Sequence, residues 1–427
     1  MEQSLEGLTD RQREIVAHQG GPLVVLGAAG TGKTHALGAR HAWLATEGGL
    51  EPEHVLALTH SVPAVDELRA QVEAGIGHGF AELHVHTVHG FCARLLRDEA
   101  DEAGLDPFVV TVSHADRLAM LLERVDELTL RLHDFRGDPA SMLAGVLGRI
   151  DRLKEALVTA DEVAAWANTL PAGDERAERE REFAQVYRTH DRMLREQGAL
   201  DAGDLVLLSL QLLQRPHVAA RVAARHRHVL VDDVPDLAYA HTRLVLALVS
   251  EHRGLTAAGD PDQAIQRARG AAGKNLRDLA GELPEARTVR LEQSLRAPRT
   301  ILDAALAVVA PNPGRLPAPA QAPPGGHVSF WRCASERAQA QAAAAEIERL
   351  IRAGADPGRI AVLVRSVRVE GQAVAAALDE RVVPYRLAGA AALLDRAEVK
   401  DVLAWLRLLV DPGDAGAVVR ALSRPPV

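Results

Sequence analysis

The sequence predicts an α/β fold in which a parallel sheet is interrupted by an all-helical insertion. Short apolar runs alternate with helical patterns near the start of the chain, as expected for a parallel sheet with helical crossovers. Between about residues 93 and 199 the strand signal vanishes, and it resumes at residue 228. The strands expected in this sheet are 23–26, 55–59, 83–87, 228–231, 255–258 and 288–291.

A second α/β unit is expected after residue 299. Its entry is marked by a Pro/Gly-rich stretch between residues 311 and 326, which breaks any helix. The expected elements of this unit are strands at 327–331, 360–364 and 383–387, and a helix that Ser335 caps and Gly354 ends.

The composition is that of a globular protein. A length of 427 residues suggests two or three compact units, and 47% hydrophobic with 25% charged residues argues against disorder. No apolar run approaches the roughly 18 residues of a membrane span, and the acidic start lacks the pattern of a signal peptide. Cys92 and Cys333 alone give no disulfide framework. We therefore expect a cytoplasmic protein with no membrane partner.

Residues 27–34 form the strongest motif of the chain. They satisfy G-x-x-x-x-G-K-[ST] between an apolar strand and a helical pattern. Glycines let the backbone wrap around phosphates, so that N–H groups and a helix N-terminus face the anion. Lys33 is expected to reach the β and γ phosphates of ATP, and the Thr34 hydroxyl to bind Mg²⁺. The alternative is a Gly-rich turn that carries a lysine by chance. The expected cofactor-binding residues here are Gly27, Ala28, Ala29, Gly30, Thr31, Gly32, Lys33 and Thr34.

A pair of carboxylates, Asp232 and Asp233, ends the apolar run 229–231. A phosphate-binding loop needs a metal-binding acid at the end of a neighbouring strand. Asp232 is expected to hold Mg²⁺, and Asp233 to sit where a base orients the attacking water. Taken alone, the pair also fits a solvated strand end.

Further segments resemble, in family order, the motifs of UvrD/Rep-like superfamily 1A DNA helicases. Residues 8–12, Leu-Thr-Asp-Arg-Gln, resemble the Q motif, whose glutamine reads adenine. Residues 259–271 resemble motif III, G-D-x-x-Q-S-I-Y-x-F-R-G-A, and 291–296 resemble motif IV, L-x-x-N-Y-R. Residues 55–59 and 87–91 match the two early DNA-contacting motifs. The other similar segments are 200–205, 384–386 and 398–401.

The resemblance implies a P-loop NTPase (RecA-like) core interrupted by a helical insertion and followed by the start of a second RecA-like core. The implied segments are the first core at 1–92 and 200–295, the insertion at 93–199, a partial second core at 296–410 and the start of a truncated segment at 411–427. Motifs V and VI of the family would follow these segments. The isolated chain is therefore expected not to unwind duplex DNA.

The resemblance also implies roles for individual residues, with ATP and Mg²⁺ as cofactors. Asp233, Gln263 and Arg296 match catalytic positions, and Gln12 and His35 match positions that contact adenine. The residues that match DNA-binding positions are Thr59, His60, Thr87, His89, Phe91, Gln266 and Arg269.

Motif II departs from the family pattern. The family sequence D-E-x-Q-D reads Asp-Asp-Val-Pro-Asp here, so Asp233 replaces a glutamate and Pro235 a glutamine. A positioned general base contributes about 10²–10⁴-fold, and this one is shorter by one methylene. If the base is merely impaired, Asp233→Glu raises turnover; if the backbone has adapted around Pro235, it lowers turnover. From the sequence we expect the first outcome.

Several positions for base stacking are also altered. The T-F-T-N-K segment begins Thr59-His60, the motif III aromatics read Gln266 and Ala268, and the motif IV tyrosine reads Leu295. Stacking is worth about 1–3 kcal/mol per base, so DNA binding is expected to be weak.

Two functions remain open at this point. The first is an ATP-driven 3′-to-5′ helicase or translocase in repair or recombination, acting on single-stranded or 3′-tailed DNA. The second is a degenerate motor that serves as a DNA- and partner-binding scaffold in an AdnAB-like helicase–nuclease complex, with a partner subunit or a C-terminal nuclease module. The net charge of −9 decides neither, because a local basic surface is enough to bind DNA. The retained phosphate-binding residues favour the first.

Two other patterns have alternative explanations. His84, His86, His89 and Cys92 could bind zinc, but they also fit a polar strand end near DNA. The charged run 174–196 could bind a partner, although a solvated helix with i,i+4 charge pairs explains it more simply.

Overall fold

The computed structural model divides the chain into two compact units, residues 1–328 and 329–427, which are described separately. The structure describes all residues except 1–4, 6, 78, 129, 133–138, 268–269, 388–396, 411, 413–416, 419 and 422–427.

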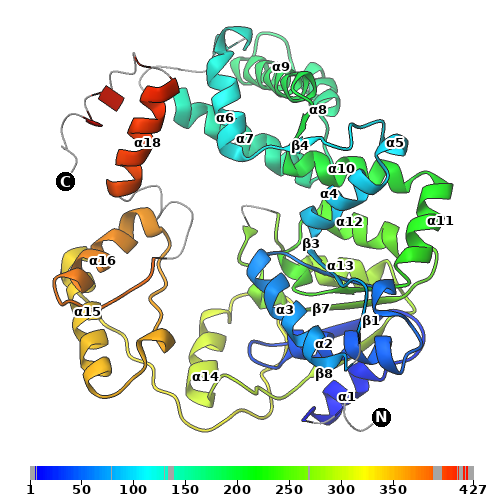
Figure 1. Ribbon diagram of the computed structural model, residues 1–427, viewed down its shortest axis with the longest axis vertical. Coiled ribbons are helices and arrows are strands. Elements are labelled where there is room, and N and C mark those ends of the chain that lie inside the picture. The colour runs from blue at the N-terminus through cyan, green and yellow to red at the C-terminus, as the bar shows by residue number, and fades with distance from the viewer. Residues whose placement is uncertain are drawn as a thin grey trace. The chain divides into compact units, whose positions relative to one another are not determined.

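The first unit is built on a six-stranded sheet in which every strand pair is parallel (Figure 1). All six strands predicted for this sheet are confirmed to within one residue at each end. The strand order does not follow the chain order, because the first and last parts of the unit interleave. The order across the sheet is β3 (His84–Thr87), β2 (Val55–Thr59), β6 (His228–Val231), β7 (Leu255–Gly259), β1 (Leu23–Gly27) and β8 (Arg287–Leu291).

Helices cover both faces of the sheet, which explains why its four central strands, β2, β6, β7 and β1, are mostly apolar and buried. Alternate residues of β2 point to opposite faces, so Leu56 and Leu58 join one hydrophobic core while Val55 and Ala57 join the other. Helices α2 and α3 lie side by side over the second of these cores (Figure 1). That core contains α1 (Asp10–Val16), α2 (Lys33–Thr46) and α3 (Val62–Gly75); the first contains α4 (Val88–Asp98), α10 (Ala202–Leu213), α11 (Pro216–Arg225), α12 (Tyr239–Leu248) and α13 (Lys274–Gly281).

The insertion between α4 and α10 is helical, with a hydrophobic core of its own. It departs from the all-helical prediction at one place, where β4 (Val110–Thr111) pairs in parallel with β5 (Ala199–Leu200) and joins the two ends of the insertion. Strands of two residues are too short to leave a periodic signal in the sequence. The helices are α5 (Ala100–Ala103), α6 (His114–Glu123), α7 (Pro139–Glu155), α8 (Ala160–Asn168) and α9 (Glu175–Glu196).

The charged run 174–196 is the helix α9, and it is not solvated on every side. Phe183 and Tyr187 are buried in the core of the insertion, while Arg179 and Glu175 form an exposed i,i+4 ion pair of 2.7 Å. Most of the charges therefore lie on the outer face of a packed helix, whereas Glu182 is buried.

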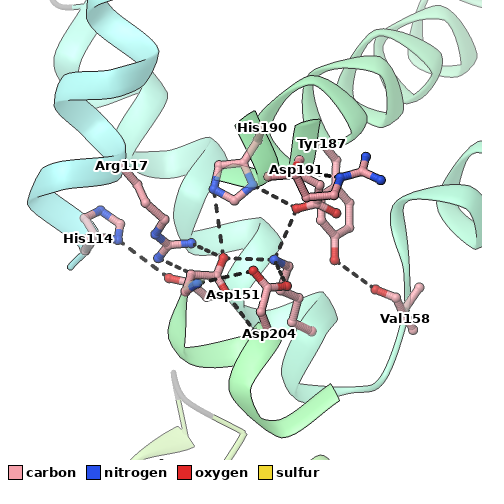
Figure 2. Close-up of polar contacts among 11 residues, drawn as sticks. His114, Arg117, Asp151, Val158, Tyr187, His190, Asp191 and Asp204 are labelled. Atoms are coloured by element: carbon pink, nitrogen blue, oxygen red, sulfur yellow. Dashed lines mark hydrogen bonds and ion pairs between the residues drawn. The ribbon is translucent and has the colours of Figure 1, made fainter. Parts of the chain in front are cut away.

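A buried charge cluster fastens the insertion to the core (Figure 2). Lys154 on α7 is 1% exposed, and its Nζ lies 2.6 Å from Asp204 Oδ1, 2.9 Å from Asp201 Oδ2 and 3.1 Å from Asp191 Oδ1. Arg117 on α6 donates a second hydrogen bond to Asp201, at 2.9 Å. Burial alone would lower the pKa of Lys154, but the carboxylates of Asp201, Asp204 and Asp191 raise it above its ordinary value. Lys154 is therefore charged at all physiological pH values.

The second unit has a small core between α15 (Glu336–Arg352) and α16 (Gln372–Asp379), and also contains α18 (Ala397–Val410). The predicted Ser335 cap is confirmed: its side chain accepts from the Ala338 N–H, and Gly354 follows the helix with φ +94°. The helix α14 (Arg299–Val308), by contrast, belongs to the first unit.

The three strands predicted in the second unit are not formed. Residues 327–331, 360–364 and 383–387 pair with no neighbouring strand in the described part of the chain. Their apolar residues led to the prediction, but a strand also needs a partner for its N–H and C=O groups. Phe330 and Leu363 are 90% and 94% exposed, so the first two runs lack the packing that defines a buried strand, whereas Val383 in the third packs in the core of the second unit.

Candidate functional site

Several of the predicted site residues lie at the carboxyl edge of the sheet, where parallel α/β folds bind ligands. Leu58 pairs with Val231, and the Asp232 N–H donates to the Leu58 carbonyl at 2.9 Å. Thr59 pairs with Thr87 on the other side. Strand order thus places Thr87, Thr59 and Asp232 level across three neighbouring strands, although the chain separates them widely.

The loop 27–34 has the geometry of a phosphate cradle. Gly30 and Gly32 have φ of +75° and +80°, a region that glycine reaches without strain. A Cβ atom on Gly27 would lie 2.5 Å from Thr31 Oγ1, so the fold requires a glycine here as well. The helix α2 begins at Lys33, directly after the loop, and adds its N-terminal N–H groups.

Lys33 is 8% exposed and folds back over the loop. Its Nζ donates to the carbonyl of Gly27 at 2.9 Å and to that of Ala28 at 3.4 Å. Its charge is therefore held at the centre of the cradle, where a phosphate would give it a stronger, charge-assisted partner.

Thr34 and Asp232 form the donor set of a divalent cation. The Thr34 hydroxyl donates to Asp232 Oδ2 at 2.6 Å, and Asp232 is 2% exposed. Burial, followed by the neighbouring Asp233 carboxylate, raises the pKa of Asp232 to about 6. A cation would relieve the cost of burying this charge, and a hydroxyl with one carboxylate suits Mg²⁺, which takes few protein ligands beside phosphate oxygens.

Asp233 has an unusual backbone. Its φ and ψ of 50° and 45° lie in the left-handed region, and its N–H donates to Asp232 Oδ1 at 2.9 Å. The turn η4 (Val234–Asp236) follows directly. Pro235 in this turn packs on Gly259, where an added Cβ would lie 2.3 Å from Pro235 Cδ. The proline of motif II is therefore accommodated by a glycine at the end of β7.

The Gln12 side chain makes two hydrogen bonds with the backbone. Its Oε1 accepts from the Thr9 N–H at 3.0 Å, in a capping box at the start of α1, and its Nε2 donates to the Gly32 carbonyl at 3.4 Å. The spacing of Thr9 and Gln12 is itself the sequence signature of a capping box. Gln12 thus holds the phosphate loop, while the exposed His35 and Leu295 flank it.

Of the remaining catalytic candidates, Arg296 lies beside the same loop and Gln263 follows the neighbouring strand β7. The Leu295 and Arg296 N–H groups donate to the Gly30 carbonyl at 2.7 Å and 3.3 Å, and the Arg296 side chain is exposed. Gln263, in the turn η5 (Pro261–Gln263), donates through Nε2 to Asp260 Oδ2 at 2.7 Å. Arg296 follows β8 and Gln263 follows β7, the two strands that flank β1.

The DNA-binding candidates separate into buried and exposed residues. Phe91 is 3% exposed inside the core, and Thr59 is 1% exposed, so neither presents a surface to a base. Thr87 caps α4 by accepting from the Gly90 N–H at 3.0 Å, and the His89 ring packs 4.9 Å from that of His241. The exposed candidates are His60 and Gln266; Arg269 lies outside the described residues.

The helical spacing of its neighbours could have identified Phe91 as a core residue. Val88, Phe91, Cys92, Leu95 and Leu96 share one buried face of α4.

Two of the residues considered for zinc binding have other contacts. Cys92 lies in the same core as Phe91, and the His84 ring packs 4.9 Å from that of His226. In the part of the chain that the structure describes, no three His, Cys, Asp or Glu side chains are arranged to hold a metal ion.

A phosphate loop at the carboxyl edge of a parallel sheet, beside a hydroxyl–carboxylate pair, defines a P-loop NTPase. The family model described as the UvrD/REP helicase N-terminal domain matches residues 8–284, and the UvrD-like helicase C-terminal domain matches residues 289–427. The chain belongs to the UvrD/REP helicase family.

Its similar proteins include named helicases. It is 32% identical to the ATP-dependent DNA helicase UvrD1 of Mycobacterium tuberculosis, over 99% of this chain and 55% of that protein. It is 30% identical to the ATP-dependent DNA helicase PcrA of Bacillus subtilis, over 99% of this chain and 56% of that protein. The chain thus spans about half the length of these curated relatives. No helix among the described residues is long and apolar enough to cross a membrane.

Proposed function

We propose that this chain is the ATP-binding motor portion of a DNA helicase or translocase that moves 3′ to 5′ on single-stranded or 3′-tailed DNA. The observation that carries the proposal is the Thr34–Asp232 contact of 2.6 Å beside the buried Lys33, because these three groups are what MgATP binding requires. The alternative, a weakly or non-hydrolysing motor that serves as a DNA- and partner-binding scaffold, is less well supported, because the groups that bind MgATP are all retained.

The chemistry follows from the positions of the side chains. Lys33 and the N–H groups at the start of α2 bind the β and γ phosphates, and Thr34 and Asp232 would hold Mg²⁺, which neutralises phosphate charge. Asp233 accepts a proton from the water whose oxygen attacks the γ-phosphorus. The bond from that phosphorus to the bridging oxygen breaks, and ADP and phosphate leave. Arg296 is the exposed cation beside the loop that can stabilise the developing negative charge.

DNA-stimulated ATP turnover in the intact protein tests this function. Lys33→Ala removes the charge that faces the phosphates, and charge-assisted hydrogen bonds contribute about 1.5–3 kcal/mol. Nucleotide affinity should therefore fall roughly 10- to 150-fold in calorimetry, with loss of turnover. Arg179→Ala, on the exposed face of α9, is the matched control and should bind as tightly as the wild type. The proposal would be refuted if Lys33→Ala bound nucleotide as tightly as the wild type. It would also be refuted if single-stranded DNA did not stimulate ATP turnover by the wild type.

Asp233→Glu is expected to lower turnover rather than raise it. The sequence favoured an impaired base, but the left-handed φ of 50° at this residue supports the second outcome, an adapted backbone. Aspartate tolerates this region better than glutamate, because its short side chain can bond locally. The kcat of the variant for ATP, with saturating single-stranded DNA, should fall several-fold. A rise in kcat would restore the impaired-base hypothesis.

A further inference from the structure

His60 lies next to Asp233 because of the strand order. It directly follows β2, and Asp233 lies two residues after the end of the neighbouring strand β6, where Leu58 pairs with Val231. The His60 Nδ1 is 3.9 Å from Asp233 Oδ2, and the two side chains are 29% and 34% exposed. The pairing of β2 with β6 therefore brings the two residues close together.

Both residues are departures from the family motifs. His60 stands where the T-F-T-N-K segment has a phenylalanine, and Asp233 stands where motif II has a glutamate. The side chain of phenylalanine has no hydrogen-bond donor, so the family residues could not make this contact. The histidine supplies a donor at the point where the carboxylate is one methylene short.

The surroundings of His60 are acidic on the side that faces the site. Asp236, in the turn after Asp233, is half-buried. Burial raises the pKa of Asp236, and the nearby His60 imidazole opposes that rise. Asp232 is already engaged with Thr34. Asp233 and Asp236 are therefore the carboxylates that the imidazole faces.

We propose that His60 is a positioning residue for Asp233: its Nδ1–H holds one carboxylate oxygen, which aims the other at the attacking water. The inference rests on the proposed ATPase function. Hydrogen bonds among catalytic groups are commonly long before substrate binds and tighten in the complex, so a distance of 3.9 Å is compatible with this role. No proton moves from His60; the proton of the water goes to Asp233.

The decisive variant is His60→Phe, which keeps an aromatic ring for a DNA base and removes the donor. A base contributes about 10²–10⁴-fold when positioned, so loss of positioning should lower kcat about tenfold or more. The KM for ATP should stay unchanged, and affinity for single-stranded DNA should stay equal or increase. His60→Gln retains an N–H donor and should recover part of the loss. His217→Phe, at an exposed histidine paired with Glu102, is the matched control and should leave kcat unchanged.

A second measurement does not depend on turnover. Long-range proton–nitrogen NMR reports which ring nitrogen of His60 carries the proton. Contact with Asp233 should fix the Nδ1–H form in the wild type, and Asp233→Ala should abolish that preference, whereas Asp98→Ala should not.

The outcomes of the two experiments are distinct. If the wild type shows no DNA-stimulated turnover, the proposed function fails. The NMR measurement of the His60 tautomer alone then decides whether His60 contacts Asp233. The inference would be overturned if the kcat of His60→Phe stayed within about twofold of the wild-type value. It would also be overturned if Asp233→Ala left the tautomer of His60 unchanged.

Discussion

Replacing Lys154 by methionine is expected to destabilise the first unit by about 3–5 kcal/mol, the usual effect of breaking a buried ion pair from one side. The variant leaves Asp201 and Asp204 without the cation that lies 2.9 Å and 2.6 Å from them. Burial would raise the pKa of Asp201, but Lys154 and then Arg117 hold it at about 2. Without Lys154, one or more carboxylates must take up a proton or draw water into the cluster.

Urea unfolding of the chain measures this effect, with two comparisons. Arg179→Met breaks an exposed ion pair on the neighbouring helix α9 and should cost no more than about 0.5 kcal/mol. Adding Asp201→Asn and Asp204→Asn to Lys154→Met should recover much of the loss, because neutral groups need no counter-charge and asparagine still caps α10. A loss below about 1 kcal/mol in Lys154→Met would mean that water screens the cluster.

The charge cluster around Lys154 could not be predicted from the sequence, unlike the strands of the sheet. The strands of the first sheet were predictable because most of them are short apolar runs, and this signal is local. The meeting of Lys154 with Asp201 depends on how α7 packs against α10, which no local pattern encodes. The strands predicted in the second unit failed for a related reason, since an apolar run such as 360–364 does not specify a partner strand.

The candidate site was also predictable from the sequence only in part. The phosphate loop was predictable residue by residue, because its glycines and Lys33 act within one short segment. The contact between His60 and Asp233 was not predictable, because it requires β2 and β6 to be neighbours in the sheet. Phe91 was assigned to DNA through its motif, although its spacing with Leu95 and Cys92 indicates a core position. Motif position and burial are independent kinds of evidence, and at Phe91 they disagree.

Acidification is expected to unfold the first unit at about pH 5, because several buried histidines must be neutral in the folded state. Burial lowers the pKa of His41 to about 4 and the pKa of both His226 and His241 to about 3. An unfolded histidine has a pKa of about 6.5. Between these values the unfolded chain binds more protons than the folded chain, so the free energy of unfolding falls as pH falls. The stabilisation is complete above about pH 6.5 and is lost toward pH 4 and below.

The size of this effect decides the outcome. Each such histidine contributes about 1.4 kcal/mol per pH unit in this range, and the whole stability of a domain is about 5–15 kcal/mol. Asp232 acts in the opposite direction, because burial raises its pKa to about 6 and the folded state then gains protons first. Burial also raises the pKa of Asp204 and Asp236, but the histidines whose pKa it lowers are more numerous than these three carboxylates, so the histidines dominate.

His241 offers the sharpest test, because its Nδ1 accepts a hydrogen bond from the Ala238 N–H at 3.1 Å at the start of α12. His241→Asn keeps an acceptor near that position and removes the titration. Urea unfolding between about pH 7.5 and pH 5 should therefore show a shallower fall in stability for the variant, by about one proton's slope of 1.4 kcal/mol per pH unit. Stability should stay nearly level above about pH 7, where histidine is neutral in both states. A wild type that keeps its full stability at about pH 5 would show that these imidazoles reach solvent when they gain a proton, and that the buried histidines do not limit the fold.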